Sequence, residues 1–392
     1  MRALARALVS AMGACADAPS VPADLAAHHA RRLSGALGTP IAASPLLGLQ
    51  TLEARVDGAP LTMLVDTGAP LTFVTPSASV PRGPFRIGAL GLGDATLYDL
   101  PALGDDPFGL SPLIGGVLGV NVICQFVATW DWQRRRFTLG EPPSDADVLG
   151  DQLEQRFTLR GGGTLTHSGA QVAVPPTRIV IDAEVEGARR TLVLDTGAST
   201  SALRGELVES LASSRRSITL RVTSQGGPAT QRLVRARSLA ALGIRVEGAA
   251  LVGFSGEALD AISAEVGARI DGLLGADVLA PYLTTLAYPA GRIILRRYRD
   301  VSHARDRWVR VGLLAGRSGG AWRVTQVFPE TSAARLGVPV GAVITRVDGV
   351  DVRERSLDEV DALLQGEAGE SRAIVTSEGE FHPAVEDLIP LP

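Results

Sequence analysis

Two copies of the tetrapeptide Asp-Thr-Gly-Ala limit how this chain can fold. They stand at residues 66–69 and 195–198, and an apolar run precedes each of them ("MLV" and "LVL"). An aspartate at the end of an apolar run leaves a hydrophobic core, so its carboxylate is expected to be partly buried and to need nearby hydrogen-bond donors. The threonine hydroxyl and the glycine N–H of the same tetrapeptide can supply them. The repetition therefore suggests two carboxylates that meet at one site.

The repetition extends well beyond the tetrapeptide. Residues 54–69 align without a gap on residues 183–198, at an offset of 129 residues. A second block, residues 115–123, aligns without a gap on residues 271–279 at an offset of 156 residues. The second offset is larger by 27 residues, which predicts an insertion in the second copy, within residues 216–270. Two gapless blocks in the same order indicate a duplicated domain.

Each copy is expected to be a small, mainly β lobe, because its first block predicts a strand, a glycine turn and a second strand. Lobe one covers residues 44–143 and lobe two covers residues 177–299, with a polar linker at residues 144–176. If the lobes pack with pseudo-twofold symmetry, the two aspartates meet on the axis. Two carboxyl groups that close titrate as a pair, one ionised and one protonated. Such a pair can activate water for peptide hydrolysis without a metal or cofactor.

Both motif stretches, "MLVDTGAPLTFV" and "LVLDTGASTSAL", resemble the active-site motif of pepsin-like and retropepsin-like aspartic proteases. The downstream "GVLG" and "GLLG" resemble the apolar-apolar-Gly element of the same fold. This resemblance implies two pseudo-twofold-related, closed-barrel-like β lobes in one chain, with Asp66 and Asp195 as the catalytic pair. The supporting loop residues that it implies are Thr67, Gly68, Thr196, Gly197 and Ser199.

The two motifs differ at one position, where lobe one has Pro70 and lobe two has Ser199. In the protease family a Ser or Thr here often hydrogen-bonds the neighbouring Asp, which Pro cannot do, so Asp66 is expected to lack a donor that Asp195 has. A protease fold that binds peptides without cutting them is therefore the alternative function. Candidate flaps over the site are residues 86–97 and 221–233, each glycine-rich and flanked by strands; ordinary surface hairpins are the alternative.

The last part of the chain, residues 300–392, predicts an α+β domain. The stretch "SAARLGVPVGAVITRVDGVDV" resembles the PDZ domains attached to bacterial envelope proteases. PDZ domains bind extended peptide ends by adding a strand to their sheet edge, and "VGLLA" implies a peptide-binding loop at Gly312, Leu313 and Leu314. An ordinary strand entry without a peptide pocket is the alternative. The predicted elements are a strand at 322–328, a short helix at 329–337, a strand-turn-strand at 342–352, a helix at 357–366 and a strand at 371–377.

The N-terminal sequence "MRALARALVSAMGACADAPS" has basic, then apolar, then small residues, which is the order of a secretory signal. Its "GAC" resembles a bacterial lipoprotein box and implies lipidation of Cys15, although Met12 stands where Leu is usual. Cleavage after Ala14, Ala16 or Ala18 is the alternative, as is a plain helical N-terminus. The sequence thus predicts an exported protein, in the bacterial periplasm or anchored to a membrane as a lipoprotein.

Composition limits the partners. A net charge of −4 gives no basic face for nucleic acid. No apolar run of about 18 residues occurs, so only a lipid anchor would attach the chain to a membrane. Two Cys and five His suggest no metal site and no cofactor. Cys124 lies in an apolar stretch and is expected to be a buried side chain, without a disulfide if Cys15 is lipidated.

The expected partners are a protein or peptide substrate and a C-terminal peptide ligand at the PDZ domain. A weaker interpretation makes the PDZ domain the functional centre and the two lobes an assembly module.

Overall fold

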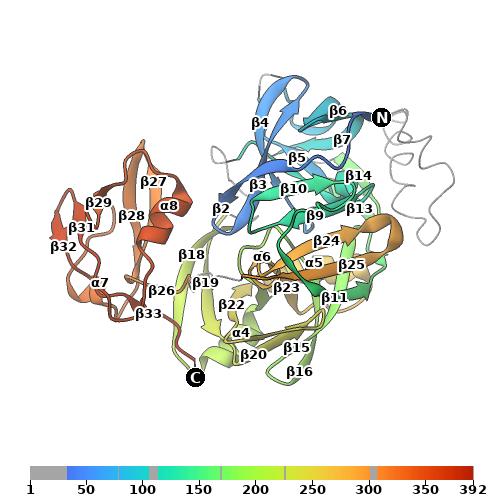
Figure 1. Ribbon diagram of the computed structural model, residues 1–392. Coiled ribbons are helices and arrows are strands. Elements are labelled where there is room, and N and C mark those ends of the chain that lie inside the picture. Colours follow the sequence, from blue (N-terminus) through green and yellow to red (C-terminus); the bar gives the residue numbers. More distant parts are fainter. Residues whose placement is uncertain are drawn as a thin grey trace.

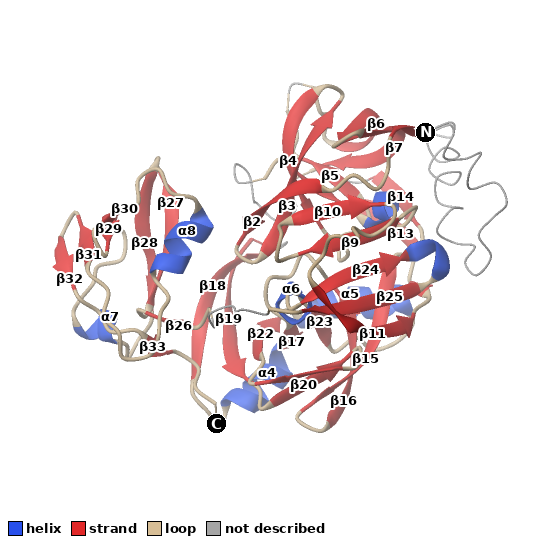
Figure 2. Ribbon diagram, viewed as in Figure 1, coloured by secondary structure: helices blue, strands red, loops and turns tan. Residues whose placement is uncertain are grey.

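The structure is a computed structural model that describes residues 33–77, 79–105, 114–167, 170–224, 227–300 and 307–391. It is mainly β, with two β lobes and a smaller C-terminal domain beside them (Figure 1; Figure 2). No helix in these ranges is long and apolar enough to cross a membrane. The predicted signal segment and Cys15 lie outside the described residues.

Lobe one is built on two hairpins. Strands β3 (Leu49–Val56) and β4 (Ala59–Val65) form the first, and β6 (Gly83–Leu92) and β7 (Ala95–Gly104) form the second. Asp57 and Gly58 turn the first hairpin with φ of 49° and 88°, the positive values that a tight two-residue β-turn needs. The lobe is completed by β5 (Thr72–Val74), β8 (Gly116–Leu118) and the short helix α3 (Val120–Ile123).

Lobe two repeats this plan. Glu186 and Gly187 turn its first hairpin with φ of 50° and 80°, as the corresponding pair does in lobe one. The parallel pairing of β16 with β23 corresponds to that of β4 with β8, so the same ladder ends in each Asp-Thr-Gly loop. The predicted duplication and mainly β fold class are confirmed. The repeated elements are β15 (Arg178–Val185), β16 (Ala188–Leu194), β17 (Ala202–Arg204), β23 (Gly272–Leu274) and α6 (Ala276–Leu279).

The insertion in lobe two begins earlier than predicted. Leu90 pairs with Val56 in lobe one, and Leu239 pairs with the corresponding Val185 in lobe two. Leu90 lies 24 residues after Asp66, whereas Leu239 lies 44 residues after Asp195. Most of the insertion therefore precedes β20, and it includes α4, which ends before residue 216. The elements of this region are α4 (Gly205–Ala212), β18 (Ser217–Ser224), β19 (Gly227–Arg235), β20 (Ser238–Ala241), β21 (Ile244–Glu247), β22 (Ala250–Phe254) and α5 (Gly256–Val266).

A run of six adjacent strands joins the lobes, in the order β2, β10, β9, β24, β25, β11. Thr129 on β9 and Thr285 on β24 share a 3.0 Å hydrogen bond between their hydroxyls across the lobe boundary. The strands are β2 (Ile41–Leu46), β9 (Val127–Asp131), β10 (Arg136–Leu139), β11 (Val148–Arg156), β24 (Tyr282–Ala287) and β25 (Arg292–Tyr298), with η1 (Tyr288–Ala290) between the last two.

Two segments predicted to lack regular structure contain strands. β11 lies in the predicted linker at 144–176, together with β12 (Leu159–Arg160), β13 (Gly163–His167) and β14 (Ala170–Val174). β11 is an edge strand that stays mostly exposed on both faces, so its sequence lacks the apolar alternation of a half-buried strand. At the N-terminal side, β1 (Leu33–Gly35) and the start of β2 precede the predicted lobe boundary at residue 44.

The C-terminal domain has its own buried core, which includes Trp322, Ile344, Val360 and Leu364. The predicted strands and helices are present, and Gly337 ends the first helix with a φ of 69°. The elements are β26 (Val309–Arg310), β27 (Leu313–Ser318), β28 (Ala321–Val327), α7 (Ser332–Arg335), β29 (Val343–Val347), β30 (Val350–Asp351), α8 (Leu357–Leu363), β31 (Ile374–Thr376), β32 (Gly379–Phe381) and β33 (Glu386–Asp387).

The C-terminal domain packs directly on lobe two. The Arg235 side chain, 6% exposed, donates from Nε to the Ile389 carbonyl at 2.7 Å. Lobe one makes a smaller contact, in which the Leu47 N–H donates to the Asp358 carboxylate at 2.8 Å. The apolar part of the interface, here called the interdomain cluster, contains Ile218, Leu220 and Leu233 of lobe two and Trp308, Phe328, Leu388 and Ile389 of the C-terminal domain.

Candidate active site

The two Asp-Thr-Gly loops meet at the lobe interface and are bonded to each other through their threonines. The Thr196 N–H donates to the Thr67 hydroxyl at 2.9 Å, and the Thr67 N–H donates to the Thr196 hydroxyl at 3.1 Å. Each hydroxyl in turn donates at 3.1 Å across the interface, that of Thr67 to the Leu194 carbonyl and that of Thr196 to the Val65 carbonyl. Both threonines are at most 1% exposed. Four buried hydrogen bonds therefore fix the position of one loop relative to the other.

The glycines allow the two carboxyl groups to approach. A Cβ atom at Gly68 would lie 2.5 Å from an Asp195 carboxylate oxygen, and one at Gly197 would lie 2.5 Å from an Asp66 carboxylate oxygen. Real Cβ atoms do not make contacts that short, so any other residue at either position would displace the facing carboxyl group or move the loops. The carboxyl groups of Asp66 and Asp195 hydrogen-bond to each other.

The two carboxyl groups differ in proton affinity. Asp66 is 5% exposed, and burial raises its pKa well above the usual range, followed by the charge of Asp195. Burial also raises the pKa of Asp195, but that residue is partly exposed. Its hydrogen bond with Asp66 and the charge of Arg178 act in the opposite direction. Asp66 is the more buried of the two carboxyl groups, so we expect it to hold the shared proton and Asp195 to ionise first.

The loop donors differ from those expected from the sequence. The Gly68 N–H donates to Asp66 at 2.6 Å, and the Gly197 N–H donates to Asp195 at 3.0 Å. The Ala198 N–H donates to the Asp195 backbone carbonyl at 3.2 Å, and it also lowers the pKa of the Asp195 carboxyl. Within the described residues, the Ser199 hydroxyl makes no hydrogen bond to Asp195. The difference in pKa between Asp66 and Asp195 therefore comes from backbone geometry and exposure. A comparison of Pro70 with Ser199 does not reveal it.

Arg178 is a site residue that the sequence interpretation missed. It opens β15 at 8% exposure, and its guanidinium donates to the Gly68 carbonyl in the Asp66 loop. Its charge favours the ionised forms of both aspartates and so lowers the pKa of each. The signal was available, because an arginine stands directly before the apolar run "IVI", where the offset of 129 residues places Leu49 in lobe one.

A second pair of contacts supports each loop from behind. In lobe one the Thr72 hydroxyl donates to Asn121 at 3.0 Å. In lobe two the Ser201 hydroxyl donates to the Asp277 carboxylate at 2.7 Å. The offsets of 129 and 156 residues relate these pairs. Different side chains thus make a hydrogen bond at the same position in the two lobes.

The two flap candidates are unlike each other. Residues 86–97 belong to the β6–β7 hairpin, which pairs with β3 on one side and with β1 on the other, so they form part of the lobe-one sheet. Residues 221–233 belong to the β18–β19 hairpin of the insertion, whose tip at 225–226 lies outside the described residues. In Figure 1 this hairpin runs upward from lobe two on the side that faces the C-terminal domain. Its strand β19 pairs with β22, so it too extends a sheet, and of the two candidates only this hairpin belongs to the insertion.

The predicted peptide-binding loop of the C-terminal domain is mostly buried. Gly312 has a φ of 73°, and a Cβ atom there would lie 2.5 Å from the Thr331 hydroxyl. Leu313 is fully buried, and Leu314 packs against the interdomain cluster. Leu314 is thus partly buried against this cluster.

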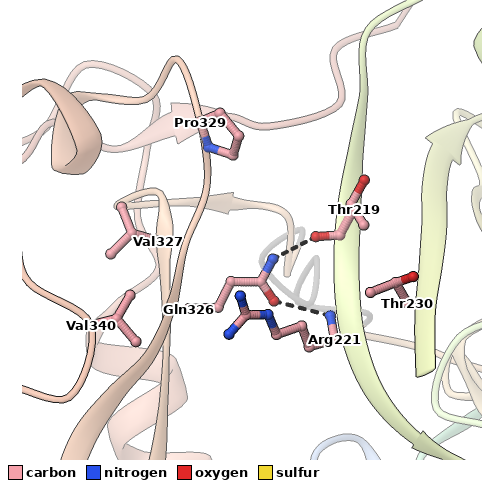
Figure 3. Close-up of a pocket in the computed structure, with 7 residues that line it drawn as sticks. All are labelled: Thr219, Arg221, Thr230, Gln326, Val327, Pro329 and Val340. Carbon is pink, nitrogen blue, oxygen red and sulfur yellow. Dashed lines mark hydrogen bonds between the residues drawn. The ribbon is translucent and has the colours of Figure 1, made fainter. Parts of the chain in front are cut away.

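A pocket of about 320 Å³ lies between β18–β19 and the C-terminal domain (Figure 3). Gln326 spans it, donating to the Thr219 carbonyl at 2.5 Å and accepting from the Arg221 N–H at 3.0 Å. These are the two bonds that a neighbouring strand would make with the edge of β18. The lining residues are Thr219, Arg221, Thr230, Gln326, Val327, Pro329 and Val340.

Cys124 is buried as expected, at 4% exposure, and it is disulfide-bonded. The sequence predicts that Cys124 has no disulfide only if Cys15 carries a lipid. The sequence has one other cysteine, Cys15, which lies outside the described residues. A lipid on Cys15 would leave Cys124 without a partner in its own chain, so lipidation and an intrachain disulfide are alternatives.

Comparisons with known proteins agree with these two parts of the molecule. A family profile described as aspartyl protease matches residues 181–278, and a PDZ domain profile matches residues 323–376. The chain thus contains an aspartyl protease domain followed by a PDZ domain. No curated protein matches the chain. Among solved structures, the crystal structure of aspartic proteinase from Irpex lacteus has 13% sequence identity and a TM-score of 0.40, over 68% of this chain and 98% of that chain.

Proposed function

We propose that this protein is an exported aspartic endopeptidase whose PDZ domain recruits or positions substrate. The observation that carries the proposal is the interlocked pair of loops, which brings two carboxyl groups into hydrogen-bond contact and gives them unequal proton affinities. The aspartyl protease profile supports the class, although it matches lobe two alone. The substrate is a protein or peptide segment in extended form.

The unequal pair assigns the roles in the reaction. Asp195, ionised first, accepts a proton from the attacking water, and the water oxygen bonds to the scissile carbonyl carbon. Asp66, which holds the shared proton, donates a hydrogen bond to the carbonyl oxygen as it gains charge. The proton taken by Asp195 then passes to the departing amine as the C–N bond breaks. Atoms balance without a cofactor.

The test replaces each aspartate with asparagine. Asp66→Asn and Asp195→Asn are each expected to lower the cleavage of an unfolded protein substrate at least 100-fold between pH 3 and pH 8, because acid–base catalysis contributes about 10²–10⁴. Asp182→Asn is the control, since Asp182 is exposed on β15 away from the loops. Equal activity in all three variants and the wild type would remove the basis of the proposal. Asp-independent peptide binding without turnover would favour the alternative, a peptide-binding protein with an inactive protease fold.

The export part of the proposal rests on the N-terminal sequence. A disulfide at Cys124 fits an oxidising compartment, where such bonds persist. Fractionation of cells that express the full-length protein should place it outside the cytoplasm. Intact mass measured without reductant then separates a lipidated Cys15 from an intrachain disulfide, and a cytoplasmic protein with its first residues intact contradicts export.

A further inference from the structure

The Arg178 side chain reaches from lobe two into the catalytic loop of lobe one. It leaves β15 of lobe two, and its Nη1 donates to the carbonyl of Gly68, the residue against which the Asp195 carboxylate packs. The carbonyl belongs to the loop that carries Asp66. An arginine of lobe two thus contacts the backbone of the lobe-one loop that carries Asp66.

Glu265 at the end of α5 fixes the orientation of this arginine. Its Oε2 accepts from Arg178 Nε at 3.2 Å and from Arg178 Nη2 at 3.1 Å. Its Oε1 accepts from the Gly162 N–H at 3.4 Å, which ties the pair to the segment before lobe two. This ion pair uses Nε and Nη2 of Arg178, so Nη1 can point at Gly68. The direction of the guanidinium is therefore set by contacts outside the catalytic loops.

Among the described residues, this arrangement occurs in lobe two alone. The residue that corresponds to Arg178 in lobe one is Leu49, which carries no charge. Glu265 lies on α5, for which the described residues of lobe one hold no counterpart. The cation and its partner are therefore an asymmetric addition to a symmetric site.

Resting on the proposed function, we propose that Arg178, oriented by Glu265, is a positioning residue that holds the Asp66 loop from across the lobe interface and stabilises the single negative charge of the aspartate pair. A cation close to a carboxylate favours its ionised form. With this charge in place, Asp195 stays ionised at lower pH, which extends activity on the acid side.

The other groups near the pair do not supply this charge. The Tyr288 phenol lies within the field of Asp66, but burial and that carboxylate raise its pKa, so it stays neutral. Asp277 faces Ser201, behind the Asp195 loop. Among the described residues, Arg178 is the cation whose charge lowers the pKa of both aspartates.

The expected effect is a shift of the pH profile. Arg178 lowers the pKa of both aspartates, so its removal raises the pH at which Asp195 ionises and the pH at which Asp66 loses its proton. In Arg178→Met, both limbs of the bell-shaped kcat/KM profile should move up by about one pH unit. Arg178→Lys keeps the charge but loses the two-nitrogen contact with Glu265, so its limbs should stay within about 0.3 units while kcat falls several-fold.

Arg204 gives a matched control, because it pairs with a carboxylate of the same helix, α5. It is 4% exposed in lobe two, and its Nη1 pairs with Asp260 of α5 at 2.7 Å, but it contacts neither catalytic loop. Arg204→Met should lower stability and leave both limbs unchanged. The proposal is overturned if folded Arg178→Met shows no shift in its kcat/KM pH profile. It is also overturned if Arg178→Met and Arg204→Met show equal shifts.

Two further measurements test the proposal if Arg178→Met does not fold or if the wild type has no activity. If Arg178→Met does not fold, Arg178→Lys and Glu265→Gln are compared, and an unchanged profile and kcat in both rejects the positioning role. If the wild type has no peptidase activity, ¹³C NMR titration of the aspartate carboxyls in wild type and Arg178→Lys or Arg178→Met measures the same shift directly. Failure of the proposed function is thereby separated from failure of this inference.

Discussion

At the scale of single residues, the threonines join the lobes and the glycines set the distance between the carboxyl groups. Thr67 and Thr196 each donate one hydrogen bond to a backbone carbonyl and accept one from a backbone N–H, all inside the interface. Removing one hydroxyl therefore leaves a buried N–H and a buried carbonyl without partners. Unpaired buried groups cost more than a typical hydrogen bond contributes.

Thr67→Val tests this role. The substitution keeps the shape and deletes the hydroxyl, so the free energy of unfolding should fall by about 2–4 kcal/mol, counting two orphaned polar groups. Thr67→Ser keeps the hydroxyl and should lose less than about 1.5 kcal/mol. Urea denaturation of the full-length variants gives both values. If Thr67→Val costs no more than Thr67→Ser, the threonine hydrogen bonds do not hold the two loops together.

The buried carboxyl of Asp66 makes a second residue-scale prediction, on stability. Its pKa in the folded state is raised, so its contribution to stability is fully present below the unfolded pKa and is lost as the pH rises through the folded value. Asp66→Asn removes the ionisable group, so at pH 7 the variant should be more stable than the wild type. At pH 3.5 the gain should largely disappear. Urea denaturation at both pH values decides, and a gain independent of pH would contradict the assignment of the proton to Asp66.

At the scale of elements, the sequence predicted the hairpins well because short-range chemistry determines them. The residue pairs Asp57-Gly58 and Glu186-Gly187 turn their strands where the glycine pattern indicated. β11 was not predicted, because pairing with β25 stabilises it without burying either face. Arg178 was not predicted as a site residue, because its partners Gly68 and Glu265 are 110 and 87 residues away in the chain. Contacts of that range depend on lobe packing, which local patterns do not encode.

The edge of β18 makes a prediction about the candidate flap. The Gln326 side chain hydrogen-bonds to the backbone of Thr219 and Arg221, as a neighbouring strand would do at this edge. Gln326→Ala should therefore expose the edge to solvent. Hydrogen exchange at the Arg221 amide should become about five-fold faster, as expected for a bond worth about 1 kcal/mol. Thr325→Ala is the control, since the Thr325 hydroxyl bonds within the PDZ domain to Leu314. Equal exchange in the two variants would mean that the PDZ domain does not steady the hairpin.

At the scale of the whole molecule, the PDZ domain and lobe two share a hydrophobic core. Removing residues 300–392 would expose Ile218, Leu220 and Leu233, so loss of activity in a truncated chain would not by itself show that the PDZ domain recruits substrate. Point substitutions within a full-length chain avoid this difficulty. The shared core also implies that the two parts stabilise each other.

Phe328 tests that coupling. It is fully buried in the interdomain cluster, and Phe328→Ala should cost about 3–5 kcal/mol. Because the lost contacts join two domains, calorimetry should show lower transition temperatures for lobe two as well as for the PDZ domain. Val360→Ala, inside the PDZ core, is the matched control and should act mainly on the PDZ transition. A lobe-two transition that stays at its wild-type temperature in Phe328→Ala would show that the domains are stable independently, and the interface would then be a docking contact that substrate or a peptide ligand can open.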